Sequence, residues 1–242
     1  MYDLHSHLVP GIDDGAKDMT EALALLRIAE QEGISHMVIT PHIHPGTFDN
    51  TSSIIQQGLF ELQAASKQAG LQIQLAAAAE VRLSTEILNW AERGMLPFVG
   101  KYQGFNVLLL EFPHSHIPAG ADKLVKWLIS KNILPMIAHP ERNRDVQSDP
   151  AKLAPFIRLN CLFQLTASSV LGDMGERSTA LALQLLQQKL FHVMATDSHN
   201  LLRRPPKLKQ AAQQVSELVS ADYAELLVHN MPKQISEVLF AS

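Results

Sequence analysis

Cysteine is nearly absent from this sequence of 242 residues: Cys161 stands alone, so no intramolecular disulfide can form. A single cysteine is typical of a reducing compartment, and we expect a cytoplasmic protein. No apolar run approaches the ~20 residues that span a bilayer, and the first residues lack the basic and apolar regions of a secretory signal. We therefore expect neither membrane insertion nor secretion.

A large excess of one charge is also missing. The formal net charge is −4 and no basic stripe is present, which argues against nucleic acid as the partner. We find no repeat, low-complexity segment or linker, and hydrophobic residues make up 46% of the chain, enough for a sizeable core. We therefore expect a single domain over residues 1–242. Histidine, by contrast, is abundant, with eleven residues.

Short apolar segments alternate with helical patterns along the chain. The segments predicted as strands are 1–4, 37–40, 71–79, 106–110, 133–138, 161–165 and 191–195. This alternation predicts an α/β fold with parallel strands joined by right-handed crossovers.

The first helix has clear boundary signals. Asp18 can cap it, Glu21 occupies the capping-box position and Gly33 follows its end. The residues expected on its buried face are Ala22, Leu23, Leu26 and Ala29. Residues 207–239 also read as helical, and Pro232 suits the start of the last helix.

Two histidines, His5 and His7, end the first predicted strand. Side chains at i and i+2 of a strand point to the same face. Two neighbouring imidazoles, with Asp13 and Asp14 in the following loop, suit a divalent metal such as Zn, Mn or Fe. The sequence therefore begins with half of a metal site.

Further potential ligands occur where other predicted strands end. Six of the seven segments end in such a residue: His5 and His7, His42, Glu80, Glu111, His139, and Asp197 and His199. Alone, each has an ordinary structural explanation, but in a βα barrel the carboxyl ends of the strands converge on the face that carries active sites. Because one ion needs only three or four protein ligands, this set predicts more than one cation.

Multinuclear sites of this kind favour phosphoester hydrolysis. Arginine suits the phosphate oxygens, and Arg142 lies three residues after His139. Arg203 and Arg204 follow His199, although Arg203 fits a solvated basic turn equally well.

Four motifs together point to a known family. They are Asp3-Leu4-His5-Ser6-His7, Pro10-Gly11-Ile12-Asp13-Asp14-Gly15, Thr40-Pro41-His42 and His139-Pro140-Glu141-Arg142. With Glu80 and the pair Asp197 and His199, they resemble the PHP (polymerase and histidinol phosphatase) superfamily. The closer resemblance is to the bacterial capsule and exopolysaccharide protein-tyrosine phosphatases of the CpsB/YwqE type, and it covers nearly the whole chain.

This resemblance implies a distorted (β/α)7 barrel that holds three divalent ions. The implied ligand sets are His5, His7, Glu80 and Asp197 for one ion, the bridging Glu80 with Glu111 and His139 for the second, and Asp14, His42 and His199 for the third. Arg142 and Arg204 match the positions that grip the phosphoryl group, and Asp13 is not expected to be a ligand. Mn is the expected metal, with Fe, Zn, Co or Mg as alternatives, since such mixed sites accept several ions.

The implied activity is hydrolysis of phosphotyrosine by a metal-activated hydroxide. The implied substrate is a tyrosine-phosphorylated protein, namely an autophosphorylating kinase of polysaccharide export, and a homo-oligomer remains open. A cysteine mechanism is excluded because that chemistry needs an arginine six residues after the thiol, where Cys161 is followed by Ala167. We expect Cys161 to be a buried core residue.

Three alternatives differ in substrate or class. The same site could serve a histidinol-phosphate or other small-molecule phosphatase, whereas a PHP exonuclease is disfavoured because no basic groove is evident. The chain could also be a regulatory module that binds phosphotyrosine without hydrolysing it. The roles of His44, His114 and His116 are open, the last two being candidates for the substrate mouth.

Overall fold

All seven predicted strands are present in the computed structural model of this chain, which describes residues 1–241. They are β1 (Tyr2–Asp3), β2 (His36–Ile39), β4 (Gln74–Ala77), β7 (Phe105–Glu111), β8 (Ile133–Ala138), β9 (Leu162–Thr166) and β10 (Val193–Ala195). The seven pairings between these strands and their short continuations are parallel, as the βα alternation requires. The exception is an antiparallel hairpin at β7.

Three further strands were not predicted from the sequence. They are β3 (His42–Ile43), β5 (Glu80–Arg82) and β6 (Gly100–Tyr102), which are too short to show a period. β3 and β5 prolong β2 and β4 in the same register, because Ile39 lies opposite Ala77 and His42 opposite Glu80. β6 forms an antiparallel hairpin with β7.

The strands form a ring around the core. One sheet has the order β1-β2-β4, and the other has the order β10-β9-β8-β7-β5-β3. β3 continues the path of β2, and β5 continues that of β4, so the two sheets join there. On the other side of the ring, the segments that follow β1 and β10 join the sheets. There the backbone N–H of Asp197 donates to the His5 carbonyl at 2.8 Å, and that of His7 donates to the Ser198 carbonyl at 2.9 Å. The expected distorted seven-stranded βα barrel is thereby confirmed.

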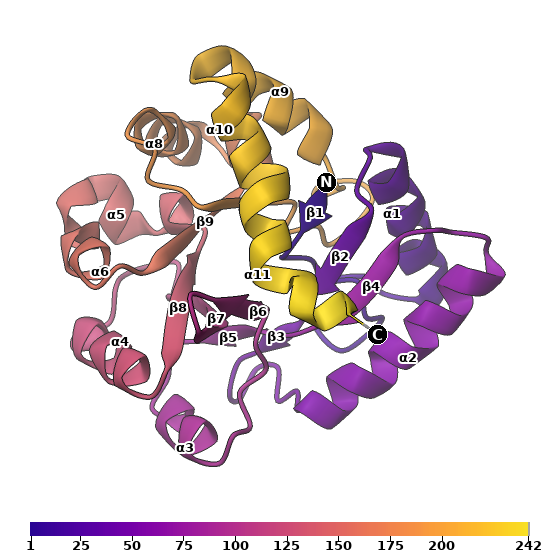
Figure 1. Cartoon of the computed structure of the whole chain (residues 1–242), viewed down its shortest axis with the longest axis horizontal. Coiled ribbons are helices and arrows are strands. Elements are labelled where there is room, and N and C mark those ends of the chain that lie inside the picture. The colour runs from indigo at the N-terminus through magenta and orange to yellow at the C-terminus, as the bar shows by residue number, and fades with distance from the viewer. Residues whose placement is uncertain (242) are drawn as a thin grey trace.

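Helices and turns connect the strands and cover the outside of the ring (Figure 1). The α-helices are α1 (Met19–Gln31), α2 (Ser52–Gln68), α3 (Glu86–Glu92), α4 (Ala121–Ser130), α5 (Arg144–Ser148), α6 (Ala154–Arg158), α7 (Ala167–Val170), α8 (Glu176–Gln187), α9 (Leu208–Leu218), α10 (Ala221–Glu225) and α11 (Met231–Phe240). Short turns of other type are η1 (Pro140–Arg142), η2 (Pro150–Leu153) and the π-helical η3 (Leu226–Asn230). None of the helices in residues 1–241 is long and apolar enough to cross a membrane.

Helix α1 begins as predicted, but its buried face differs by one residue. The Asp18 carboxylate accepts the Glu21 backbone N–H at 2.9 Å and caps the helix. The buried residues are Ala22, Leu25, Leu26 and Ala29. The prediction of Leu23 was wrong: its side chain is only partly buried, because one residue of rotation turns it off the i, i+3, i+4 stripe that Leu25 completes.

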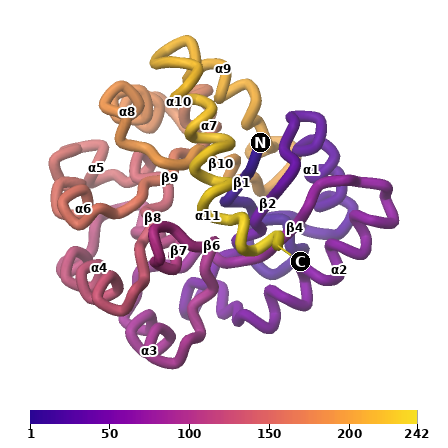
Figure 2. The backbone as a smooth tube through the Cα atoms, viewed as in Figure 1, coloured from indigo at the N-terminus to yellow at the C-terminus, as the bar shows by residue number. Residues whose placement is uncertain are grey.

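The inside of the ring is filled with aliphatic side chains and closed by α11. Its buried members include Leu4, Val38, Val107, Leu109, Met136, Val193 and, from α11, Ile235. Pro232 lies in the first turn of α11, as predicted. The helix crosses the strands (Figures 1 and 2), and Phe240 packs edge-on against His36, with 4.9 Å between ring centroids, where β2 begins. Helix α11 therefore covers the amino end of the barrel.

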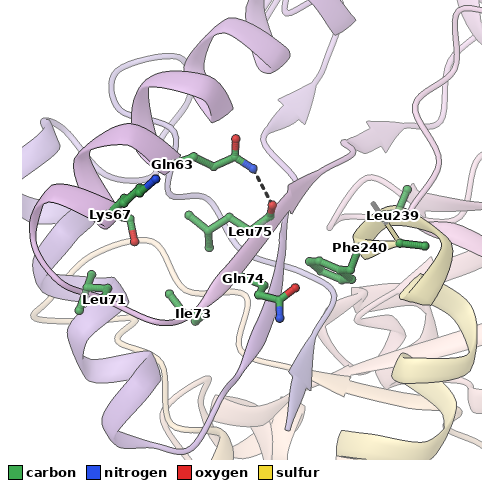
Figure 3. A pocket seen from close by; sticks show the side chains of 10 residues that line it. Gln63, Lys67, Leu71, Ile73, Gln74, Leu75, Leu239 and Phe240 are labelled. Carbon is green, nitrogen blue, oxygen red and sulfur yellow. Dashed lines mark hydrogen bonds between the residues drawn. The ribbon is translucent and has the colours of Figure 1, made fainter.

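A cavity of about 380 Å³ lies beside this end, between α2, β4 and the end of α11 (Figure 3). The Gln63 side chain crosses it and donates to the Leu75 carbonyl at 2.8 Å. Its lining residues are Gln63, Ser66, Lys67, Leu71, Ile73, Gln74, Leu75, Leu239, Phe240 and Ala241. This set includes no histidine, cysteine or carboxylate, so the cavity is unrelated to the predicted metal site.

The approach of α11 to β6 depends on one glycine. A Cβ atom at Gly100 would lie 1.8 Å from the Ile235 carbonyl oxygen, and the backbone there has a φ of +143°. No other residue fits this position without moving the α11 backbone.

The substitution Gly100→Ala should lower the free energy of unfolding by about 3 kcal/mol, because the new Cβ overlaps backbone atoms. Gly104→Ala, in the turn of the same hairpin, is the matched control. Its Cβ would meet no atom within 4 Å, so only the backbone strain of about 1 kcal/mol remains. Urea unfolding of both variants measures the difference, and equal losses would contradict the close packing of α11.

Candidate metal centre

The nine predicted ligands come together at the carboxyl end of the barrel. Within the described residues, four groups of donor atoms lie within 4.8 Å of one another: His7, Asp14, His42 and His199; His5, His7 and Glu80; His5, His139 and Asp197; His42, Glu80 and Glu111. The groups share members and so form one cluster. The side chain of Asp14 is 55% exposed, whereas the other eight are nearly or fully buried.

His5 and His7 face each other with their Nε2 atoms 3.1 Å apart. The Nδ1 atom of His5 lies 2.9 Å from Gln164 Oε1, which also accepts the His139 backbone N–H, so this atom is the amide oxygen and His5 Nδ1 donates to it. His7 Nδ1 donates likewise to Asp13 Oδ2 at 2.7 Å. In the neutral rings both Nε2 atoms therefore carry lone pairs that point at the same place, an arrangement that requires a cation.

A proton can meet the same requirement. Burial opposes a charge on His5, but the carboxylates of Glu80 and Asp197 outweigh it and raise its pKa to about 9. His42 behaves similarly: burial is outweighed by Glu80 and Asp14, and its pKa rises to about 11. The cluster thus attracts positive charge strongly, and metal ions would displace these protons.

The Gly-Ile-Asp-Asp-Gly motif builds one wall of the site. Asp13 Oδ2 binds His7 and also accepts the His42 backbone N–H at 3.0 Å, so Asp13 orients two ligand-bearing segments. A Cβ at Gly15 would lie 2.0 Å from the His7 carbonyl oxygen, so only glycine allows the loop to pack there. Asp13 was not expected to be a ligand, and its positioning role was missed.

Asp14, the adjacent residue, points to two imidazoles. Its Oδ1 lies 3.4 Å from His42 Nε2 and 3.5 Å from His199 Nε2. The neighbouring imidazoles of His199 and His42 lower the pKa of Asp14. His199 Nδ1 donates to the Asp197 carbonyl at 2.9 Å, which leaves the Nε2 lone pair for the cluster.

Glu80 lies at the centre of the cluster. Its Oε1 is 2.9 Å from His139 Nε2, and its Oε2 is 3.3 Å from His5 Nε2 and 3.0 Å from His42 Nδ1. Burial works against its charge, but His5 and His42 hold the pKa of Glu80 well below its usual range. A carboxylate whose two oxygens each lie beside metal-ligating imidazole nitrogens is suited to bridge two ions.

Glu111 has a cationic partner that the sequence did not reveal. Arg82 Nε lies 2.9 Å from Glu111 Oε2. Burial and the neighbouring Glu80 raise the pKa of Glu111 to about 8. The family resemblance joins Glu111 with His139, whereas here Glu111 groups with Glu80 and His42. The allocation of ligands to individual ions stays a prediction.

Both predicted arginines contact one oxygen of Asp197. Arg142 and Arg204 each form an ion pair with Oδ2, while Oδ1 faces His5 at 3.4 Å and His7 at 3.5 Å. Burial disfavours the charge on Asp197, but Arg204 and His5 hold its pKa well below the usual range. One oxygen of Asp197 therefore holds the two guanidinium groups together, and the other oxygen is a donor atom of the cluster.

Several buried polar atoms here have no hydrogen-bond partner. They are His42 Nδ1, Glu80 Oε2, Asp197 Oδ1 and His199 Nε2, while Glu111 Oε2 has only its ion pair with Arg82. Leaving such an atom unpaired costs about 1–3 kcal/mol, and more when it is charged. Each of them is a nitrogen or oxygen donor of the kind that Mn²⁺, Fe²⁺ and Zn²⁺ accept. The residues present therefore fit divalent metal ions.

The remaining candidates divide into two kinds. His114 lies at the mouth, because its Nε2 is 3.6 Å from Glu111 Oε1 and its ring stacks on His139. Arg203 and His116 are exposed, and neither is among the grouped donors. Burial raises the pKa of Cys161 to about 12, as expected for a core thiol.

Comparison with known proteins places this geometry in a family. The model of the family described as capsular polysaccharide synthesis, CpsB/CapC, matches residues 1–237. This chain belongs to that family. The resemblance of its motifs to the CpsB/YwqE type is thus confirmed.

Individual relatives of this CpsB/CapC chain agree over most of its length. The tyrosine-protein phosphatase YwqE of Bacillus subtilis is 28% identical over 231 residues, which are 95% of this chain and 89% of YwqE. CapC of Staphylococcus aureus is 33% identical over 210 residues, 87% of this chain and 81% of CapC. A chain from the crystal structures of YwqE and of CpsB from Streptococcus pneumoniae, described as metal-dependent tyrosine phosphatases, superposes with a TM-score of 0.91 at 26% identity, covering 98% of this chain and 94% of that one.

Replacing Asp13 tests the positioning of His7. Asp13→Asn should weaken Mn²⁺ affinity about 10- to 100-fold, because His7 and the His42 backbone lose a charged acceptor. Isothermal titration calorimetry measures this affinity. Asp18→Asn, which makes the same change of carboxylate to amide at the α1 cap, outside the donor cluster, is the matched control and should bind Mn²⁺ as the wild type does. Unchanged affinity in Asp13→Asn would show that His7 needs no such anchor.

Proposed function

We propose that this chain is a metal-dependent protein-tyrosine phosphatase of capsular or extracellular polysaccharide synthesis. The observation that carries the proposal is the cluster of nine nitrogen and oxygen donors beside two arginines, in a chain whose relatives are named tyrosine-protein phosphatases. Three divalent ions, with Mn as the expected metal, account for the number of donors. The proposed substrate is a tyrosine-phosphorylated kinase of polysaccharide export.

The arginines supply the phosphate grip. Because Asp197 Oδ2 holds both Arg142 and Arg204, their guanidinium groups lie side by side next to the donor cluster. Their remaining N–H groups can donate to the equatorial oxygens of a phosphoryl group, and arginine forks suit those oxygens.

When bound, divalent ions supply a hydroxide nucleophile at neutral pH and neutralise charge that develops on the phosphoryl group. Glu80, which contacts four imidazoles, keeps the donors at fixed spacing. His114, at the mouth, lies where the leaving phenolate would emerge. With a pKa of about 10, a phenolate leaves with less protonic help than an alkoxide.

Metal reconstitution tests the activity. Protein stripped with EDTA should not hydrolyse a phosphotyrosine peptide, and Mn²⁺ should restore turnover. Arg142→Ala should lower kcat/KM about 10²- to 10³-fold, the usual loss when one donor to a developing charge is removed. Arg144→Ala is the matched control, because Arg144 is exposed and lies two residues away. It should keep wild-type turnover.

Two outcomes would contradict this assignment. Protein that binds the phosphotyrosine peptide but stays inactive with Mn, Co, Fe and Zn alike would be a binding module. Faster turnover of histidinol phosphate than of the peptide would make it a small-molecule phosphatase.

The thiol offers a separate test. Cys161→Ala should leave kcat/KM within about twofold of wild type, whereas His42→Ala should abolish turnover. Because burial raises the pKa of the Cys161 thiol to about 12, native Cys161 should resist iodoacetamide at pH 9, where the unfolded protein reacts. As pH rises above 9, the unfolded thiol loses its proton first, so this group lowers stability there. Loss of activity in Cys161→Ala would favour a covalent cysteine mechanism.

A further inference from the structure

A second cavity, of about 520 Å³, lies beside the metal centre. One wall is the segment that follows β3, and the facing wall is α3 and the loop after it. We call it the Phe48 pocket and define it by Ile43, Phe48 and Asn50 on the first wall and by Trp90, Met95 and Leu96 on the second. Its volume is within the range of about 300–1,000 Å³ that is typical of ligand pockets.

The first wall of the Phe48 pocket is joined to a metal-site histidine. The rings of Phe48 and His42 are stacked, with 5.5 Å between centroids and 9° between planes. The Asn50 side-chain amide donates to the His42 carbonyl at 2.8 Å and to the Ile12 carbonyl at 2.9 Å. The pocket therefore adjoins the catalytic face, and the Phe48 ring lies between the pocket and His42 of the donor cluster.

The loop that carries Phe48 is held by its own hydrogen bonds. The backbone N–H of Phe48 donates to the His44 carbonyl at 2.8 Å, and that of His44 donates to the Phe48 carbonyl at 3.0 Å. Asp49 accepts the Gly46 N–H at 2.8 Å, which closes the turn. This wall is thus formed before any ligand arrives, and the backbone of His44, whose role the sequence left open, holds the loop in place.

The Phe48 pocket has a mainly apolar lining, with one polar edge formed by residues 49–53. Trp90 is partly buried, and Met95 is 48% exposed, so a large apolar surface faces solvent here. Asp49 is the single charged residue among the lining residues that the structure describes, and no lysine or arginine is among them. The pocket does not match a second phosphate or an acidic side chain, whereas it does match an aliphatic or aromatic one.

We propose that the Phe48 pocket binds an apolar side chain of the phosphoprotein substrate, one or two residues from the phosphotyrosine. The proposal rests on the proposed function of the metal centre. In an extended peptide, successive residues advance by about 3.3 Å, so a residue next to a phosphotyrosine anchored at the cluster can cross Phe48 and enter the pocket. Such a contact selects protein substrates over small phosphomonoesters, which fill only the metal centre.

Two phosphotyrosine peptides test the proposal, one with Leu and one with Ser at the positions flanking the phosphotyrosine, with p-nitrophenyl phosphate as the small substrate. The wild type should prefer the Leu peptide about 10-fold in kcat/KM, since burying such a side chain is worth well over 1 kcal/mol. Met95→Lys and Trp90→Ala should reduce this preference to about twofold or less. Both variants should turn over p-nitrophenyl phosphate within about twofold of wild type.

Leu88→Ala is the matched control, because Leu88 is a 40% exposed apolar residue of α3 that does not line the pocket. It should keep both the preference and the turnover. Equal kcat/KM of the wild type for the two peptides would overturn the proposal. So would loss of turnover in Met95→Lys on all three substrates alike.

Failure of the proposed function would be seen separately, as wild-type protein that hydrolyses none of the three substrates with any metal. The same peptides, labelled with a fluorophore, then report on the pocket by binding. A tighter Kd for the Leu peptide that Met95→Lys removes would support the pocket, and equal Kd values would overturn it.

Discussion

The structure depends on the meeting of histidine nitrogens and carboxylate oxygens in a largely buried cluster at the carboxyl end of the barrel. The closest approach is between His5 Nε2 and His7 Nε2, which lie 3.1 Å apart. Both lone pairs point inward, and Glu80 adds negative charge beside them. Burying this set without cations would cost many kcal/mol, because buried charges must be paired. The arginines at Asp197 neutralise only one edge of it. The donor cluster therefore needs positive charge, from protons or from metal ions.

Neighbouring residues hold the donors against their mutual repulsion. Asp3 accepts the backbone N–H of Thr196 at 3.0 Å and its hydroxyl at 2.5 Å, which ties the end of β10 to β1 directly below His5. Two donor residues, His139 and Asp197, have backbone φ values of +31° and +50°. Non-glycine residues adopt such conformations at a cost and keep them only where the surroundings enforce them. The strain at these two positions shows that the barrel, and not local preference, sets the geometry of the site.

The sequence alone was enough to recognise candidate ligands that lie at the end of a predicted strand. Each of the seven strands had an apolar run of its own, and topology then placed the ends of those runs together, so eight of the nine donors could be proposed from their position along the strands. Asp14, in a loop, came only from the family resemblance. Residues that act through distant partners escaped. Gln164 looks like a defect in an apolar strand, and its partner His5 is 159 positions away. Arg82 and Asp13 likewise gain meaning only from the side chains beside them, and β6 is defined by its pairing with β7 rather than by any period.

Helix α11 fills the amino end of the barrel, where its Ile235 and the strand residues Leu4 and Val38 are fully buried. Substrates must then reach the metal centre, and products must leave it, through the carboxyl end. In a phosphatase built this way, the protein substrate would stand over the inorganic phosphate that it has just released. The dephosphorylated protein would leave first and the phosphate last. Free phosphate would therefore compete with the next phosphoprotein for the metal centre.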